Sequence, residues 1–282
     1  MPNSKEVFDR FVSAITLDDS LDEKRSIAFL ILECEFRIAK SQILANTEVE
    51  NFDWQRLDSL IGRINKHEPI QYILGEQEFF GRTFFVNPSV LIPRPETELL
   101  VENVLTFARK RQPSINILDI GTGSGCIPIT LALELPSANL FATDISGDAI
   151  VVAKTNAAKH KTNVSFIRSD IISDELPNQQ FDVIVSNPPY IMEKEKATMR
   201  NNVLQYEPHE ALFISNDDPL LFYRIIAAKA KGNLKPKGLL AFEINERFGK
   251  DMVQLLAKLG YSNIEIIKDF SGKDRIAKVI NE

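Results

Sequence analysis

Cysteine, histidine and tryptophan are scarce in this chain, whose 282 residues include two cysteines, three histidines and one tryptophan. Cys34 and Cys126 lie far apart, and neither has cysteine or histidine neighbours at the spacing of a metal site. We therefore expect no disulfide and no metal ion. Each cysteine is expected to be a small, buried apolar residue.

Long apolar runs are also missing. No stretch reaches the roughly 20 apolar residues that a membrane-spanning helix needs. The N-terminus, Met1-Pro2-Asn3-Ser4-Lys5-Glu6, has no basic start followed by an apolar core. These absences argue against a membrane protein and a secretory signal, and they predict a cytoplasmic protein.

Basic runs are few. Lysine and arginine number 33 against 39 aspartates and glutamates, which gives a formal net charge of −6. Arg109-Lys110-Arg111 is a short basic cluster that suits the solvated end of a helix. Proteins that hold duplex DNA need several basic contacts to phosphate. We therefore expect no direct nucleic-acid partner, and a macromolecular partner is expected to be a protein.

The N-terminal segment of the chain has the pattern of helices. Apolar residues recur there at steps of three and four residues, as they do on one face of a helix. Asp18-Asp19-Ser20 offers an N-cap before the first stripe, and Asn46-Thr47 marks a break. The two stripes are Ile27, Leu30, Ile31, Cys34, Ile38 and Leu57, Leu60, Ile61, Ile64. We predict a small helical domain over residues 1–75.

A change of pattern at residues 76–93 predicts a β-hairpin linker between two domains. Strand-favouring phenylalanines and valines are interrupted there by Gly81 and Asn87-Pro88. Directly afterwards, Pro95 suits the first turn of a helix, and the acids that follow it suit a helix N-terminus.

From residue 114 onward, short apolar strands alternate with helical stretches. Such strands are typical of a parallel sheet whose two faces are covered by helices. We therefore predict an α/β domain over residues 94–282. Its expected strands are Ile115–Ile120, Leu140–Thr143, Val164–Ile167, Phe181–Val185, Leu239–Ile244, Ile264–Ile267 and Ile276–Ile280.

A glycine loop, Gly121-Thr122-Gly123-Ser124-Gly125, follows the first of these strands and opens a helix. Glycine lets the backbone approach a ligand closely, and nucleotide-like ligands bind beyond the carboxyl ends of strands in such sheets. Asp144 ends the second strand about 20 residues later, where a carboxylate can accept hydrogen bonds from ribose hydroxyls. The combination predicts a nucleotide-type cofactor.

The loop favours S-adenosylmethionine over a dinucleotide. Its spacing is Gly-x-Gly-x-Gly, whereas a bound pyrophosphate goes with Gly-x-Gly-x-x-Gly. Asp119 adds a second carboxylate near the loop, and an acidic surround suits a cationic sulfonium better than a diphosphate.

Ser186-Asn187-Pro188-Pro189-Tyr190 follows the fourth strand, at the same end of the sheet. The two prolines stiffen the backbone so that the Pro188 carbonyl can face the pocket, next to the side-chain oxygen of Asn187. Two acceptors match the two hydrogens of an NH₂ group, and Tyr190 offers a face on which a planar amide or base can stack. Catalysis would then rest on positioning and preorganised electrostatics. The tetrapeptide predicts a planar NH₂ substrate and leaves glutamine and adenine both open.

The sequence resembles the release factor glutamine methyltransferases of the HemK/PrmC type, from the N-terminal helices almost to the C-terminus. Adenine-N6 DNA methyltransferases also carry the tetrapeptide, but the resemblance extends beyond it. The further stretches that carry it are Gln71–Glu76, Leu91-Ile92-Pro93-Arg94-Pro95-Glu96-Thr97-Glu98, Asp119–Gly125, Tyr206-Glu207-Pro208 and Gly272-Lys273-Asp274-Arg275.

The resemblance implies a class I, Rossmann-like methyltransferase domain that methylates N5 of the glutamine in the Gly-Gly-Gln loop of class I peptide-chain release factors. Gly121 to Gly125 and Asp144 would bind the methyl donor, with Asp170 and Ile171 near its adenine. Asn187, Pro188, Pro189 and Tyr190 would hold the glutamine amide, with Asn187 touching the donor as well. The N-terminal helices would help to dock the release factor. Relatives often have an aromatic residue where this chain has Ile171.

Three other functions are compatible with parts of the pattern. An adenine-N6 DNA methyltransferase would need to flip its base and would need a basic recognition region, which the acidic balance disfavours. A ribosomal-protein glutamine methyltransferase shares the tetrapeptide, and the stretches around Tyr72 and Arg94 disfavour it. A non-catalytic binding module is disfavoured by the intact loop, Asp144 and tetrapeptide.

Overall fold

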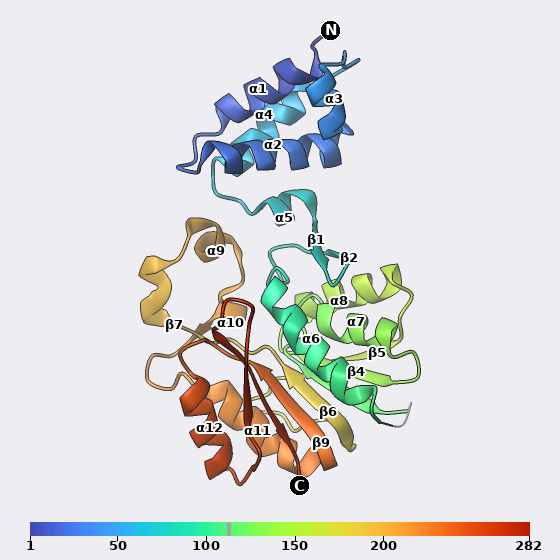
Figure 1. Cartoon of the computed structure of the whole chain (residues 1–282), viewed down its shortest axis with the longest axis vertical. Helices are drawn as coiled ribbons and strands as arrows, with labels where there is room; N and C mark the ends of the chain where they lie inside the picture. The colour runs from blue at the N-terminus through green and yellow to red at the C-terminus, as the bar shows by residue number, and fades with distance from the viewer. Residues whose placement is uncertain (112–113) are drawn as a thin grey trace. The chain divides into compact units, whose positions relative to one another are not determined.

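The computed structural model describes residues 1–111 and 114–282, which form two compact units (Figure 1). Unit 1 contains Met1–Glu76 and Arg200–Tyr206, and unit 2 contains Gln77–Met199 and Glu207–Glu282. The sequence predicts a break near residue 75, but it gives no sign that Arg200–Tyr206 packs with the N-terminal helices. None of the helices in the described ranges is long and apolar enough to cross a membrane.

Unit 1 is built from helices around an apolar core that includes Phe11, Ile31 and Leu57. Ser20 caps the second helix as the sequence predicts, because its hydroxyl accepts a hydrogen bond from the Glu23 N–H. The helices are α1 (Ser4–Ala14), α2 (Leu21–Phe36), α3 (Lys40–Ala45), α4 (Trp54–Ile64), α5 (Ile70–Leu74) and α9 (Asn201–Tyr206).

The apolar stripe predicted on α2 is partly wrong. Leu30 and Cys34 are exposed, so Cys34 is not the buried residue that we expected. The buried positions are Ala28, Ile31 and Leu32, whose spacing of three and four residues defines the inward face. Leu30 and Cys34 fall outside that face, and the sequence spacing alone did not separate the two choices.

The predicted hairpin is present as strands β1 (Glu76–Phe79) and β2 (Arg82–Phe85). Phe79 and Phe84 are buried in the core of unit 2. The side chain of Asn156, which is fully buried, accepts a hydrogen bond from the Phe85 N–H at 2.7 Å and donates one to the Phe85 carbonyl at 2.9 Å. These contacts attach the hairpin to the core of unit 2.

Within the described residues, unit 2 contains a seven-stranded sheet in the order β10-β11-β9-β6-β3-β4-β5. The five strands from β9 to β5 run parallel, as predicted, whereas β11 runs antiparallel to both β9 and β10. A short turn joins β10 to β11, and strands joined so tightly must be antiparallel. The strands are β3 (Asn116–Ile120), β4 (Asn139–Asp144), β5 (Val164–Arg168), β6 (Phe181–Ser186), β9 (Leu234–Glu243), β10 (Glu265–Lys268) and β11 (Asp274–Ile280).

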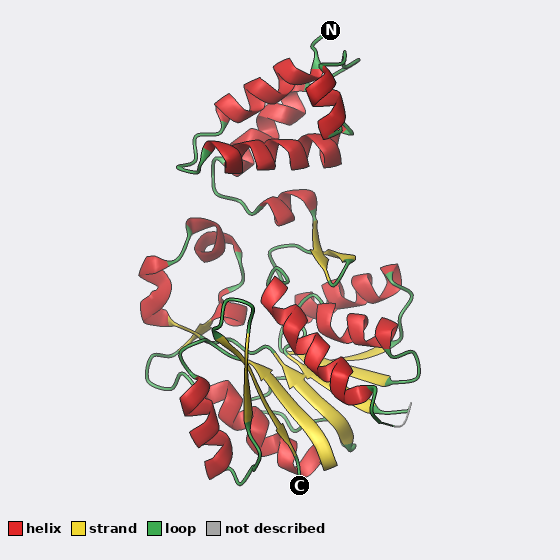
Figure 2. Ribbon diagram, in the orientation of Figure 1, coloured by secondary structure: helices red, strands yellow, loops and turns green. Residues whose placement is uncertain are grey.

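Helices cover both faces of this sheet, as Figure 2 shows. The clusters of buried residues on the two faces are separate, and each contains side chains of the sheet together with side chains of its own helices. One cluster includes α6 (Pro95–Ala108), α7 (Cys126–Glu134) and α8 (Gly147–Lys159); the other includes α11 (Leu221–Asn233) and α12 (Gly249–Lys258). A short strand pair, β7 (Ile191–Met192) and β8 (Phe213–Ile214), the 3₁₀ turn η1 (Glu193–Thr198) and α10 (His209–Leu212) lie between β6 and α11 along the chain.

The parallel register brings the candidate site together. Ile120 at the end of β3 pairs with Thr143 of β4 on one side and with Ser186 of β6 on the other. The glycine loop, Asp144 and the tetrapeptide each follow one of these three strand ends. They therefore meet at one edge of the sheet, as the sequence predicts.

Candidate active site

The glycine loop adopts a backbone that glycine favours, because Gly121, Gly123 and Gly125 all have positive φ, of 75°, 53° and 80°. A Cβ added at Gly121 or Gly123 would meet no atom within 4 Å. A Cβ at Gly125 would lie 2.9 Å from the Ile129 side chain and 3.1 Å from Ala153. The first two glycines therefore face open space, whereas the third allows α7 to pack against α8.

Asp144 is held in place by two backbone donors. Its carboxylate accepts hydrogen bonds from the Gly123 N–H at 2.8 Å and from the Ser146 N–H at 2.9 Å. Burial raises the pKa of Asp144, and these backbone hydrogen bonds oppose that rise. Each carboxylate oxygen keeps a free lone pair, so the group can still accept hydrogen bonds from a ligand.

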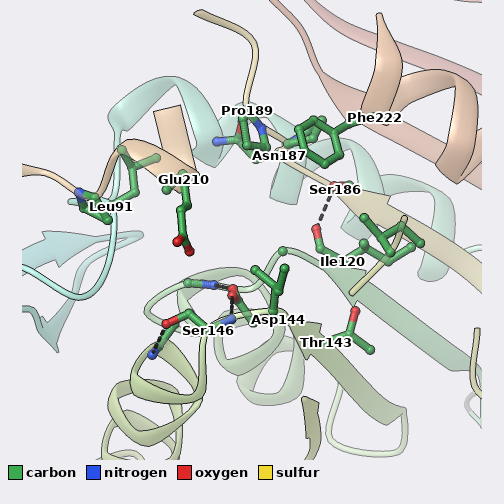
Figure 3. A pocket seen from close by; sticks show the side chains of 18 of the residues that line it. Leu91, Ile120, Thr143, Asp144, Ser146, Ser186, Asn187, Pro189, Glu210 and Phe222 are labelled. Carbon is green, nitrogen blue, oxygen red and sulfur yellow. Dashed lines mark hydrogen bonds between the residues drawn. The ribbon is translucent and has the colours of Figure 1, made fainter. Parts of the chain in front are cut away.

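A cavity of about 440 Å³ lies over this edge of the sheet. In Figure 3, Asp144 and Ser146 stand on one side of the hollow and Asn187 and Pro189 on the opposite side. The predicted site residues that line the cavity are Gly121, Gly123, Asp144, Asp170, Ile171, Asn187, Pro188 and Pro189. Thr122, Ser124, Gly125 and Tyr190 are not among the lining residues.

The lining also contains side chains to which the sequence assigned no role at the site. Ser89, Val90 and Leu91 come from the segment between the hairpin and α6, and Phe222 and Ile226 come from α11. Leu91 opens one of the stretches that carry the family resemblance, but the other four are ordinary apolar and hydroxyl side chains that no motif marks. Such segments are brought together only by the fold.

The acidic surround of the cavity differs from the prediction. Asp119 is fully buried and does not line the cavity, whereas Glu210 does. Figure 3 shows the Glu210 carboxylate directed into the hollow toward Asp144. Burial raises the pKa of Asp119 to about 7. Both Asp119 oxygens lack a hydrogen-bond partner among the residues that the structure describes.

The tetrapeptide is anchored at both ends. The Ser186 hydroxyl donates to the Ile120 carbonyl at 2.6 Å, which ties the end of β6 to the end of β3. The Tyr190 hydroxyl donates to Glu243 Oε1 at 3.1 Å. Asn187 Nδ2 donates to Thr97 Oγ1 at 3.2 Å, and the Thr97 hydroxyl donates to Glu243 Oε2 at 2.6 Å. The tetrapeptide is thus connected to α6 and to the end of β9.

The stretch around Arg94 forms a second set of contacts. Glu207 is buried; its Oε1 lies 2.5 Å from Arg94 Nη2 and its Oε2 accepts from the Ile92 N–H at 3.2 Å. Glu98 accepts a hydrogen bond from the Phe80 N–H at 2.7 Å, which ties α6 to the hairpin. Pro95 begins α6 in its first turn, as predicted.

This arrangement suits transfer chemistry at a planar nitrogen. The cavity places a carboxylate with free lone pairs at one wall and a backbone stiffened by two prolines at the other. Since Asn187 Nδ2 is occupied by Thr97, the side-chain oxygen of Asn187 is the atom left to accept from a ligand.

Two protein families match this chain. Residues 95–212 match the family described as Methyltransferase small domain, and residues 13–75 match the PrmC N-terminal domain. The second match lies within the helical region that the sequence predicts for residues 1–75.

Curated relatives match over most of the chain. A release factor glutamine methyltransferase from Flavobacterium psychrophilum is 43% identical over 274 residues, which cover 96% of both chains. The enzyme of the same name from Bacteroides thetaiotaomicron is 47% identical over 223 residues, or 79% of each chain.

Solved structures with the same fold are more distant in sequence. The catalytic domain of hMettl16 in complex with an RNA hairpin superposes with a TM-score of 0.56 at 14% identity, over 82% of this chain and 93% of that one. A 16S rRNA N2 G1207 methyltransferase from T. thermophilus, RsmC, has a TM-score of 0.54 at 16% identity, over 73% of this chain and 50% of that one. At these identities the likeness concerns the fold.

Proposed function

Because this chain belongs to the family of release factor glutamine methyltransferases, we propose that it methylates N5 of the glutamine in the Gly-Gly-Gln loop of class I peptide-chain release factors, with S-adenosylmethionine as the donor. The observation that carries the proposal is the position of Asn187-Pro188-Pro189 on the cavity wall opposite Asp144. A substrate nitrogen held by the tetrapeptide would therefore face the methyl donor bound at Asp144.

The cavity fits the proposed donor. Gly121 and Gly123 leave open space where a side chain would stand, and Asp144 keeps lone pairs for ribose hydroxyls. Asp170 and Ile171 line the cavity where the adenine is expected. The carboxylates of Asp144, Asp170 and Glu210 suit a cation. When bound, S-adenosylmethionine supplies a methyl group on a positively charged sulfur. The sulfur is the leaving group and keeps the electron pair of the S–C bond.

The remaining task of the protein is to hold the amide nitrogen. Asn187 Oδ1 and the Pro188 carbonyl are the two proposed acceptors for the hydrogens of the glutamine NH₂ group. Their hydrogen bonds orient the nitrogen lone pair toward the methyl carbon and stabilise the positive charge that develops on the nitrogen. The nitrogen attacks with both hydrogens in place, so no side-chain base is required before transfer, and one of the two protons is released to solvent after the new N–C bond has formed. Tyr190 does not line the cavity, and we propose that it offers its ring to the planar amide only when the substrate is bound.

An adenine-N6 DNA methyltransferase would use the same acceptors, but the net charge of −6 disfavours a DNA substrate. A ribosomal-protein glutamine is disfavoured by the match of residues 13–75 to the PrmC N-terminal domain. We propose that the helical unit 1 contributes to docking of the release factor.

The proposal is tested with purified protein and S-adenosylmethionine that carries a labelled methyl group. We expect label on a class I release factor and none on the same factor with its loop glutamine changed to alanine. DNA and ribosomal proteins serve as competing substrates. Label on DNA with none on the release factor would overturn the proposed substrate.

A further inference from the structure

The strand that follows α11 ends in a carboxylate that does not line the cavity. Glu243 is the last residue of β9 and is 1% exposed. The register explains its position, because Phe242 pairs with Ser186 at the end of β6. Glu243 follows Phe242, and Asn187 follows Ser186. The two residues therefore lie side by side, one step beyond this pair on two neighbouring parallel strands.

Two hydroxyls donate to this carboxylate, one to each oxygen. The Tyr190 hydroxyl donates to Oε1 at 3.1 Å, and the Thr97 hydroxyl donates to Oε2 at 2.6 Å. The Tyr223 hydroxyl additionally donates to the backbone carbonyl of Glu243 at 3.1 Å. Burial raises the pKa of Glu243, while these hydrogen bonds and the nearby positive charge of Arg275 favour its ionised form.

The hydrogen bonds of this group run in one direction. Thr97 gives its single proton to Glu243 Oε2, and Tyr190 gives its proton to Oε1, so both carboxylate oxygens act as acceptors. The Thr97 oxygen is then left with lone pairs only, and it must accept from its next neighbour. That neighbour is Asn187, whose Nδ2 lies 3.2 Å away. The Asn187 amide is consequently held with its NH₂ group toward Thr97.

We propose that Glu243 is a positioning residue that sets the orientation of the Asn187 side-chain amide through Thr97. The chain Glu243–Thr97–Asn187 directs the oxygen of Asn187 to the cavity, where it can accept from an NH₂ substrate. The inference rests on the proposed function of Asn187 as an acceptor. It also gives a chemical reason for a threonine at position 97, in the stretch Arg94-Pro95-Glu96-Thr97.

The first test removes the middle hydroxyl of the hydrogen-bonded series Glu243–Thr97–Asn187 with little change in side-chain shape. In Thr97→Val the hydroxyl is lost, and the Asn187 amide can turn either face to the cavity. We expect kcat to fall by about 10- to 100-fold, because small misplacements at a reacting centre cost about that much. The donor dissociation constant, measured by calorimetry, should change much less than kcat, because Gly121, Gly123 and Asp144 are unaltered. Thr97→Ser keeps the hydroxyl and should restore most of the lost turnover.

A matched control is Thr130→Val. Thr130 is also fully buried and lies on α7, and its hydroxyl has no hydrogen-bond partner among the described residues. The same loss of a hydroxyl there should leave kcat unchanged. Equal losses in Thr97→Val and Thr130→Val, or full turnover in Thr97→Val, would overturn the proposal.

The second test uses Glu243→Gln. Glutamine can donate to Thr97 through its NH₂ group, which frees the Thr97 proton for the Asn187 oxygen and reverses the chain. We expect a fall in kcat of similar size. In the double variant with Thr97→Val the two losses should not multiply, since either change alone already breaks the chain. Multiplied losses would show that the residues act separately.

A readout without substrate separates this inference from the proposed function. The side-chain NH₂ resonance of Asn187 can be assigned by its absence in Asn187→Ala. We expect this resonance to shift in Thr97→Val and Glu243→Gln and to stay in place in Thr130→Val. An unshifted resonance in the first two variants would overturn the positioning role of Glu243, whether or not the release factor is methylated. A shifted resonance in a protein that does not label the release factor would support that positioning role and would contradict the release factor as the substrate.

Discussion

At the scale of single residues, the cavity separates two kinds of carboxylate. Asp144 lines the cavity and is bound by backbone N–H groups, so it is a preorganised acceptor. Asp119 lies one strand away, fully buried and without hydrogen-bond partners among the described residues. In the sequence, both residues look alike, because each is an acid at the end of a strand. Only the direction of the side chain in the folded protein decides which of the two lines the cavity.

Asp144→Ala tests the acceptor role. We expect the donor affinity to fall by about 1–3 kcal/mol, which is the usual effect of leaving buried polar partners unpaired. Calorimetric titration with S-adenosylmethionine measures the change. Asp148→Ala is the control, because Asp148 is an exposed acid in the first turn of α8 that does not line the cavity. Equal affinities in Asp144→Ala and the unchanged protein would contradict the role of Asp144.

Asp119→Asn tests the buried acid. The pKa of Asp119 is about 7 in the folded chain against an ordinary value of 3.8. Its contribution to stability is therefore greatest below pH 4 and is lost as the pH rises toward 7. The introduced asparagine does not titrate, so the stability of the variant relative to the wild type should increase between pH 5 and pH 8. The upper bound over this range is about 3 kcal/mol, because only the two pH units between 5 and the pKa of about 7 contribute, at about 1.4 kcal/mol each. Urea unfolding at both pH values measures this difference, and a difference that does not change with pH would contradict it.

At the scale of helices and strands, the sequence predicted the parallel strands and the helices between them because continuous apolar runs and caps are local signals. It missed the direction of β11, since strand direction depends on which strand lies beside it. It also misjudged the inward face of α2, where Leu30 and Cys34 are exposed. Several apolar stripes fitted that helix equally well, and only packing selects one.

The start of α6 depends on the ion pair between Arg94 and Glu207. Arg94→Ala leaves the Glu207 carboxylate buried without its cation, and we expect the free energy of unfolding to fall by about 2–3 kcal/mol. This is less than for a fully buried pair, because the Arg94 side chain is 33% exposed. Urea unfolding monitored by circular dichroism measures the change.

Arg109→Ala is the matched control for that ion pair. Arg109 pairs with Glu134 at 2.9 Å, but its side chain is 58% exposed, and Glu134 keeps a second partner in Arg82. We expect a change of about 1 kcal/mol or less. If both arginine variants lose the same stability, the Arg94 pair has no special role in the fold.

At the scale of the whole molecule, the sequence predicted the site better than it predicted the division of the chain. Gly121, Asp144 and Asn187 carry recognisable chemistry, and they do line one cavity. Thr97, Glu207 and Glu243 act through partners about 90 or more residues away, and no local pattern reveals such pairs. The same reason hid the segment Arg200–Tyr206, which packs with helices more than 100 residues earlier in the chain.

Removal of residues 1–76 tests the independence of the two units. All residues that line the cavity belong to unit 2, so we expect unchanged donor affinity in the shortened protein. Methylation of a release factor should be lost if unit 1 docks it. Arg200–Tyr206 would lose its packing partners, and the Tyr206 hydroxyl would lose the Lys66 carbonyl to which it donates at 2.8 Å. Trypsin should therefore cut after Arg200 faster than in the full chain, and an unchanged rate would contradict this packing.

The packing of Arg200–Tyr206 with the first 76 residues limits how such a gene can recombine. A crossover at the boundary after Glu76 would join the N-terminal helices of one parent to the segment Arg200–Tyr206 of the other. That segment evolved to pack with the helices of its own parent. Functional hybrids of two homologous genes should therefore inherit the two pieces together. Substitutions at Tyr206 and its neighbours are expected to vary among lineages in step with the N-terminal helices, although the adjacent Glu207 belongs to the other unit.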